Sequence, residues 1–177
     1  MSVSQITKLA LAQSMKKLME KRPMKKISVS DIVNECHLNR QTFYYHFRDK
    51  YDLVNWIFYT ELIIYIKDTP MEKLQVLEKI CEYFYENKEF YKNAFEEECQ
   101  NSFSEYFTET LHNIMKIQLG EVFKNKKDLD FYITFYADAI RLAISKWLMD
   151  GAKIPPEKFV SMLKNTIQIA AEYLSED

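Results

Sequence analysis

Four side chains within one short segment, Arg40, Gln41, Tyr44 and Tyr45, are of types that contact nucleic acid. An arginine guanidinium can bind guanine through two hydrogen bonds, and a glutamine amide can bind adenine in the same way. Tyrosine hydroxyls suit phosphate oxygens, and Tyr44 could also reach a thymine methyl group. The alternative is a solvated surface on which the arginine and the glutamine form only local pairs. Which reading applies depends on the element that presents these side chains.

The segment itself predicts a short helix from Arg40 to Phe47. Asn39 directly before it is a residue type that caps helix N-termini. Phe43 and Phe47 are four residues apart, so they face inward together. The four side chains named above then fall on other faces of the helix, where we expect them to be largely exposed.

A second short helix is predicted just before it. Ser28 is suited to be its N-cap, and Asp31 three residues later gives a start that resembles a capping box. This helix ends near Cys36, and residues 37–39 form a tight turn. Two short helices joined by such a turn, the second with a polar and aromatic outer face, describe a helix-turn-helix.

The net charge of −2 conceals an asymmetry between the two ends of the chain. Residues 1–50 contain ten Lys or Arg and four Asp or Glu, a net charge of +6, which leaves −8 on the remainder. A basic head on an acidic body is typical of a protein that places one end against a polyanion. The charge alone is equally compatible with a solvated basic surface that has no partner.

The rest of the chain predicts an all-α fold of about nine helices. Only two glycines and four prolines interrupt 177 residues, which favours long helices with short connections. The first helix has an apolar stripe that includes Ile6, and Pro23 follows it. Gly151 is suited to end a helix, and Thr69-Pro70 to begin one. We divide the chain into a DNA-binding head, 1–50, and a regulatory and dimerisation body, 51–177. Besides the two helices on either side of the turn, the predicted helices cover 4–21, 49–67, 69–85, 88–98, 102–123, 129–149 and 156–174.

Several classes of protein are disfavoured. The chain has no glycine-rich phosphate loop or nucleophile elbow, and its three histidines, His37, His46 and His112, are scattered, so an enzyme is not expected. Three widely spaced cysteines predict neither a disulfide framework nor a zinc site. We predict no cofactor, no metal ion and no membrane span, and a cytoplasmic location.

The head resembles the TetR family of regulators, and the resemblance covers roughly residues 5–60. It rests on two segments. Ile27 to Val33 reads Ile-Ser-Val-Ser-Asp-Ile-Val, and Asn39 to Lys50 reads Asn-Arg-Gln-Thr-Phe-Tyr-Tyr-His-Phe-Arg-Asp-Lys. His37 stands where the family usually has a small residue, often glycine, and a turn there can require positive φ, which histidine adopts more readily than most residues. With the following Tyr-Asp-Leu-Val-Asn-Trp, the second segment is similar to a branch that activates dihydroxyacetone kinase genes.

The resemblance implies that the head binds double-stranded DNA. Arg40 and Gln41, at the start of the recognition helix, would read base edges, and most of the other family positions would contact the phosphate backbone. For Tyr45 the alternative is packing against the first helix. The predicted DNA-binding residues are Lys26, Ser28, Ser30, Arg40, Gln41, Thr42, Tyr44, Tyr45, His46 and Lys50.

In the resembled family the last two helices pair across a two-fold axis, which implies a homodimer and a near-palindromic operator. More than one face of each of these helices is apolar. The alternative is burial within one subunit. The predicted interface residues are Tyr136, Ile140, Ile144, Trp147, Phe159, Leu163, Ile167 and Ala170.

The middle helices are rich in aromatic residues, and in the resembled family this region encloses a small-molecule pocket. Plain core packing explains most of these residues equally well. The candidate pocket residues are Tyr59, Tyr83, Phe103, Tyr106 and Phe107.

Three functions are therefore left open. The first is an activator of dihydroxyacetone kinase genes that works with a co-activator protein. The second is a repressor that a small-molecule effector releases from DNA. The third is a helical adaptor that binds protein and not DNA, in which case the basic head would be incidental.

Overall fold

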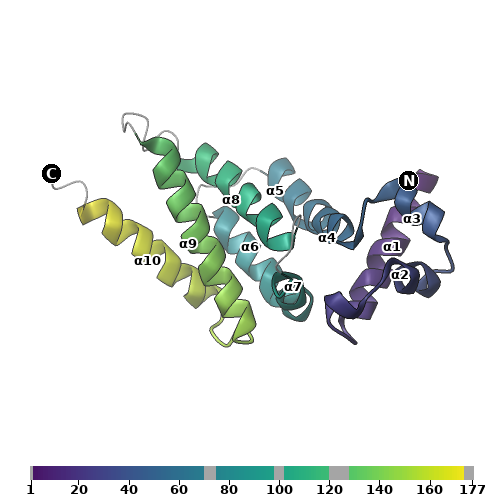
Figure 1. Ribbon diagram of the computed structural model, residues 1–177. Coiled ribbons are helices and arrows are strands. Elements are labelled where there is room, and N and C mark those ends of the chain that lie inside the picture. The colour runs from purple at the N-terminus through teal and green to yellow at the C-terminus, as the bar shows by residue number, and fades with distance from the viewer. Residues whose placement is uncertain (1, 70–74, 98–101, 120–127, 174–177) are drawn as a thin grey trace. The chain divides into compact units, whose positions relative to one another are not determined.

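The computed structural model describes residues 2–69, 75–97, 102–119 and 128–173, without the side chains of 118–119 and 167–173. Every regular element in these ranges is a helix, which confirms the all-α class (Figure 1). Contacts group the chain into two compact units, Met1–Tyr65 with Glu89–Phe107, and Ile66–Lys88 with Thr108–Asp177. The division at residue 50 was made on function, and it stays a prediction.

The first part of the chain forms the predicted helix-turn-helix with helix ends shifted by one or two residues. Its elements are α1 (Val3–Met19), the short 3₁₀ helix η1 (Met24–Lys26), α2 (Val29–Glu35) and α3 (Arg40–His46). Leu11, Met15, Ile32 and Phe43 are fully buried where these helices pack together. Ile6 is 55% exposed, so its place on the buried stripe was wrong, because the buried face of α1 begins only at Leu11.

The turn between α2 and α3 is a Schellman-type helix ending. The Leu38 amide donates to the Val33 carbonyl at 2.8 Å, and the His37 amide donates to Asn34 at 3.3 Å. His37 has φ of 55°, a left-handed conformation that glycine usually supplies. The expectation that histidine takes positive φ here is confirmed. The turn thereby sets the direction in which α3 leaves α2.

The helix predicted from Asp49 is present but contains an irregularity. It consists of α4 (Lys50–Phe58), a π-helical stretch η2 (Tyr59–Ile63) and α5 (Ile64–Asp68). The Asp49 carboxylate caps it by accepting the Tyr51 and Asp52 amides, each at 2.8 Å. In the π turn the Ile64 amide reaches back five residues to the Tyr59 carbonyl. Counted as one, this helix brings the described total to the nine that were predicted.

An aromatic cluster forms another part of the first unit's core. Phe58 contacts Tyr91 of α7 (Lys88–Phe95) and Phe103 and Phe107 of α8 (Phe103–Leu119), with ring centroids 5.3–6.0 Å apart. Phe103 and Phe107 stack at 5.9 Å. Edge-to-face and offset contacts of this kind stabilise a core beyond the burial of area alone.

In the second unit, α6 (Gln75–Glu86) packs against α9 (Leu129–Met149) and α10 (Pro156–Tyr173). Gly151, with φ of 82°, ends α9 as predicted, and the Ala152 amide donates to the Trp147 carbonyl at 2.8 Å. The Trp147 ring stacks on Phe159 at 4.5 Å, and its indole N–H donates to the Ile154 carbonyl. The predicted helix start at Thr69-Pro70 reaches into 70–74, outside the described residues. None of the described helices is both long enough and apolar enough to cross a membrane.

Candidate nucleic-acid interface

The outer face of α3 presents the side chains that the sequence predicted. Phe43 and Phe47 are buried at 0% and 3%, while Arg40 and Gln41 are exposed. Tyr44 is 50% exposed and Tyr45 83%. The alternative in which Tyr45 packs against the first helix is therefore wrong. A small convex helix with two buried phenylalanines beneath it is suited to enter a major groove.

The Arg40 side chain lies against its neighbours on the same surface. Its Nη2 donates to the Tyr44 hydroxyl oxygen at 3.3 Å, and its Nη1 makes a long contact of 3.5 Å to the Ser30 hydroxyl. The guanidinium carbon lies 5.8 Å from the centre of the Tyr44 ring. Since a guanidinium has five N–H donors, the others are left for a base edge. Ser30, half-buried on α2, thus contacts the predicted base-reading residue.

Thr42 is held by the helix cap. The Asn39 Oδ1 accepts both the Thr42 amide, at 2.8 Å, and the Thr42 hydroxyl, at 3.1 Å. The hydroxyl oxygen keeps its acceptor capacity, but its hydrogen is directed to Asn39. The cap therefore fixes the first turn of α3, in which Arg40 and Gln41 lie.

His46 closes α3 beside a basic residue that the sequence reasoning missed. Burial, with a smaller contribution from the positive charge of Lys8, lowers the pKa of His46 below its ordinary value of 6.5. A neutral imidazole can still donate a hydrogen bond to a phosphate. The Lys8 ammonium lies 5.6 Å and 5.7 Å from the ring centres of Phe47 and Trp56. These contacts join residues that are 39 and 48 positions apart in the chain, so no local sequence pattern predicts them.

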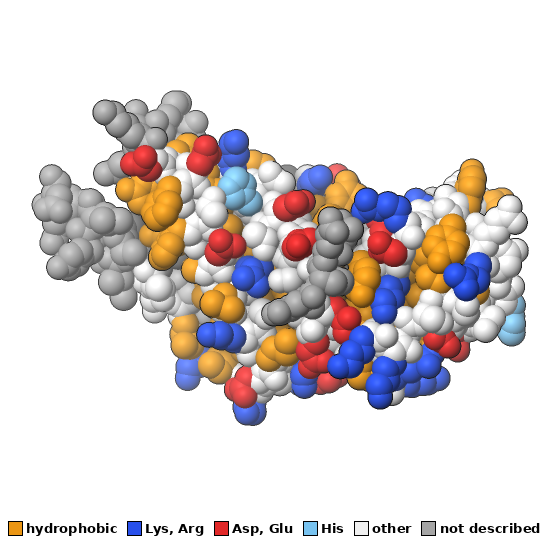
Figure 2. Space-filling view, viewed as in Figure 1, with side chains coloured by type: hydrophobic (Ala, Val, Ile, Leu, Met, Phe, Trp, Pro, Cys, Tyr) orange, Lys and Arg blue, Asp and Glu red, His pale blue; other side chains and the backbone are white. Residues whose placement is uncertain are grey.

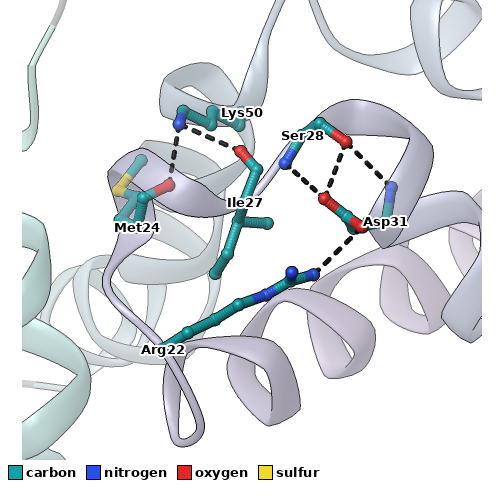
Figure 3. Close-up of polar contacts among 6 residues, drawn as sticks. All are labelled: Arg22, Met24, Ile27, Ser28, Asp31 and Lys50. Carbon is teal, nitrogen blue, oxygen red and sulfur yellow. Dashed lines mark hydrogen bonds and ion pairs between the residues drawn. The ribbon is translucent and has the colours of Figure 1, made fainter.

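Lys50 does not point freely into solvent. Its ammonium donates to the carbonyl oxygens of Met24, at 2.7 Å, and Ile27, at 3.0 Å (Figure 3). The predicted capping box is confirmed on the far side of the same segment. The Ser28 amide and hydroxyl donate to the Asp31 carboxylate at 2.8 and 2.7 Å, and the Asp31 amide donates back to the hydroxyl at 3.2 Å.

Asp31 also pairs with Arg22 across 3.1 Å. The hydrogen bonds from Ser28, and then Arg22, lower the pKa of Asp31 to about 2. Lys26 and Ser28, two predicted phosphate contacts, are exposed on the segment between these groups. In Figure 2, Lys and Arg side chains gather along the lower edge of the part that holds α1 and α2. Direct DNA contact by each of the ten residues stays a prediction.

The residues predicted for the dimer interface fall into three groups. Ile140, Ile144, Trp147 and Phe159 are at most 7% exposed within the single chain, so burial in one subunit, the alternative given above, describes them. Tyr136 and Leu163 are half-buried. The side chains of Ile167 and Ala170 lie outside the description.

A different row of α9 is open to solvent. Phe131 is 67% exposed, Phe135 58%, Leu142 45% and Met149 37%. Their spacing of four and seven residues places them along one stripe, opposite the buried one. The expectation that this helix has two apolar faces is confirmed. None of the four residues of the open row was among the interface residues predicted from the sequence. Figure 2 shows exposed apolar side chains in this region.

The candidate pocket residues are dispersed between the two units. Phe103 and Phe107 belong to the packed aromatic cluster, which favours the core-packing alternative for these two residues. The Tyr106 ring makes an edge-to-face contact with Phe58, with ring centroids 6.3 Å apart. Tyr83 is half-buried on α6 in the other unit. Tyr59, 37% exposed, lines an open groove of about 340 Å³ next to Lys8 and Trp56. A ligand pocket made from these residues stays a prediction.

Comparison with known proteins identifies both parts of the chain. Residues 15–57 match the family model described as bacterial regulatory proteins, tetR family, and residues 72–169 match one described as transcriptional regulator C-terminal region. Over 137 residues the chain is 30% identical to the HTH-type dhaKLM operon transcriptional activator DhaS of Lactococcus lactis. That alignment covers 75% of this chain and 69% of the relative.

Solved structures agree. The dihydroxyacetone kinase operon activator DhaS superposes with a TM-score of 0.72 at 25% identity, covering 95% of this chain and 97% of that one. A TetR transcriptional regulator from Streptococcus agalactiae also gives 0.72, at 20% identity, over 93% of this chain and 94% of that one. The second likeness is one of fold.

Proposed function

Because this chain belongs to the TetR family of DNA-binding transcriptional regulators, we propose that it binds a near-palindromic operator as a homodimer and activates dihydroxyacetone kinase genes. The family consists of regulators and not of enzymes. The observation that carries the proposal is the outer face of α3, where exposed donor groups surround two buried phenylalanines.

In this proposal Arg40 and Gln41 read bases. They lie in the first turn of α3, the end that helix-turn-helix proteins insert toward base edges. The contacts of Arg40 with Ser30 and Tyr44 restrict its side chain before DNA arrives, so less conformational entropy is lost on binding. A bidentate contact of this kind discriminates one base from another by about 1–3 kcal/mol.

The backbone contacts come from the residues around this helix. Tyr44, Tyr45 and the neutral His46 offer hydroxyl and imidazole donors, and Lys26 offers a charge. Phosphate contacts fix register and orientation, but they do not distinguish sequences. Loss of one of them should therefore weaken binding to every duplex by a similar factor.

The homodimer rests on the open row of α9. Four apolar side chains on one stripe, with Met162 of α10 also 49% exposed, form a surface that a second copy of the chain would bury. A two-fold dimer would present two α3 helices to DNA, and the operator would share that symmetry.

The assignment to dihydroxyacetone kinase genes rests on the likeness to DhaS, whose described role is activation of the dhaKLM operon. A co-activator protein as partner, in place of a small-molecule effector, is part of the same proposal. Deleting the gene should lower transcripts of the host's dihydroxyacetone kinase genes. A rise in those transcripts would instead indicate a repressor and contradict the proposal.

Binding can be tested with a duplex that the wild-type protein selects from a random-sequence pool. Arg40→Ala should reduce the ratio of selected to random binding, because the base contact is lost. Tyr45→Ala should weaken binding to both duplexes alike. Equal effects of the two variants on that ratio would contradict the assignment of Arg40. Failure of the wild-type protein to select any sequence would contradict the function itself.

A further inference from the structure

Lys50 occupies an unfavourable place for a positive charge. It is the first residue of α4, and the N-terminus of a helix dipole disfavours cations. Its ammonium is directed at two carbonyl oxygens that belong to residues 26 and 23 positions earlier, Met24 and Ile27. The bonds thus join the start of α4 to the segment from Arg22 to Asp31. Figure 3 shows the Lys50 ammonium directed at the carbonyl oxygens of Met24 and Ile27.

The second anchor of that segment is the Asp31 carboxylate. It accepts hydrogen bonds from the amide and hydroxyl of Ser28 and pairs with Arg22, the first residue of the segment. The segment from Arg22 to Asp31 is therefore held at two places. The Lys50 ammonium binds two of its backbone carbonyls, and the Asp31 carboxylate joins its last residue to its first, Arg22. The side chains of Met24 and Ile27, each 1% exposed, fix the same stretch from the core side.

The segment carries two exposed basic side chains. Lys25 and Lys26 project into solvent between the two anchors, and Ser28 follows them. A charged side chain neutralises a phosphate effectively only if its backbone is held at the right place. A loose segment would have to be ordered on binding, and that ordering would reduce affinity.

We propose that Lys50 is a positioning residue, which together with Asp31 holds the segment from Arg22 to Asp31 so that Lys26 and Ser28 meet the DNA backbone. This proposal rests on the DNA-binding function proposed above, and it replaces the phosphate contact predicted for Lys50. An ammonium has three donors, and Lys50 directs two of them at carbonyls. Both bonds direct the ammonium at the backbone of the protein itself.

The first test compares Lys50→Met with Lys26→Met on the selected duplex at several salt concentrations. Both remove one charge and keep an unbranched stem. Lys26→Met should reduce the slope of log K against log salt by about 0.9 per subunit, as loss of a phosphate contact does. Lys50→Met should weaken binding at least tenfold with the slope unchanged. A slope change equal to that of Lys26→Met, or an unchanged affinity, would overturn the proposal.

A second measurement needs no DNA and therefore does not depend on the proposed function. Hydrogen exchange of the Ile27 amide, which donates to the Met24 carbonyl at 2.9 Å, reports on the segment. Lys50→Met should speed this exchange at least fivefold, and Lys26→Met should leave it as in the wild type. Equal exchange in all three proteins would mean that Lys50 does not hold the segment.

Asp31→Asn attacks the other anchor and keeps the proposal testable if Lys50→Met does not fold. It makes the protein one charge more positive, so electrostatics alone predicts tighter DNA binding. Positioning predicts binding at least fivefold weaker. Glu35→Gln at the far end of α2, where Glu35 pairs with Lys17 at 3.4 Å, adds the same charge and should not weaken binding. Tighter binding by both variants would overturn the proposal. If the wild-type protein selects no duplex while the exchange results hold, only the proposed function fails.

Discussion

Replacing Phe135 by serine is expected to weaken the homodimer strongly without harming the fold of the subunit. Phe135 is 58% exposed and stacks on Phe131, 67% exposed, with ring centres 6.4 Å apart. A phenylalanine side chain offers roughly 200 Å² for burial. Each subunit of a two-fold dimer would bury the exposed part of this side chain, so the two copies bury roughly 230 Å² together. At about 25 cal/mol per Å² this area contributes at most about 6 kcal/mol to the free energy of dimerisation.

The measurable effect should be about half of that ceiling. Interface area converts to affinity incompletely, because ordering and imperfect packing offset part of it. About 3 kcal/mol corresponds to a roughly hundredfold increase in the dimer dissociation constant. Sedimentation equilibrium across a range of protein concentrations would measure this constant for both proteins.

The control is Ile117→Ser on α8, which also removes an exposed apolar side chain, at 82% exposure, but off the α9 row. It should leave the dissociation constant unchanged. The helical content of the Phe135→Ser subunit, measured by circular dichroism, should equal that of the wild type, because the Phe135 side chain is 58% exposed within the single chain. A dissociation constant for Phe135→Ser within threefold of the wild type, or a monomeric wild type, would refute the assignment of the interface to this row.

Three further changes probe the fold. Phe43→Ala removes a fully buried ring beneath α3 and should cost about 3–5 kcal/mol in a denaturant titration; a loss under 1 kcal/mol would mean that α3 is not held by this contact. The Cβ that Gly151→Ala adds would have no atom within 4 Å, so the loss of folding stability comes from backbone strain at φ of 82°, about 1–2 kcal/mol. An unchanged thermal midpoint would contradict this. Asp31, whose pKa falls from an ordinary 3.8 to about 2, stabilises the fold above about pH 4 and loses this effect as the pH falls toward 2. The size of the pKa shift limits this contribution to folding stability to about 2.5 kcal/mol. Because the Asp31 side chain is 35% exposed, screening by solvent reduces the contribution to about 1 kcal/mol. The stability difference between wild type and Asp31→Asn should therefore narrow from pH 5 to pH 3, and a constant difference would exclude the ionic cause.

The features that the sequence predicted well are those decided within four or five residues. The Ser28–Asp31 capping box, the Asn39 cap and the inward pair Phe43 and Phe47 all follow from local spacing, and the structure has each of them. The positive φ of His37 is likewise a property of one turn. Local rules of this kind hold because the competing partners are a few bonds away and few in number.

The features that could not be predicted from the sequence depend on residues distant in the chain. Lys50 matched a phosphate-binding position by type, but the carbonyls that hold it lie more than twenty residues away. The π turn at Tyr59–Ile63 adds a residue to one helical turn, and hydrophobic periodicity does not register such an insertion. On α9, the sequence indicated more than one apolar face, but it could not say that Ile144 faces the subunit core and Phe135 the solvent.

In the proposed interface, sequence preference and affinity depend on different residues of the head. Arg40 and Gln41 lie in the turn that Asn39 caps, whereas Lys26 and Ser28 lie in the segment that Lys50 and Asp31 hold. Asp31 contacts Ser28 and Arg22, and Lys50 contacts the carbonyls of Met24 and Ile27, so both hold the segment that carries Lys26. A change in those anchors should therefore scale the affinity for every duplex by the same factor, while a change at Arg40 alters the ratio between duplexes. In this proposal, substitutions of Lys50 should change how tightly the protein binds DNA more than they change which sequence it selects.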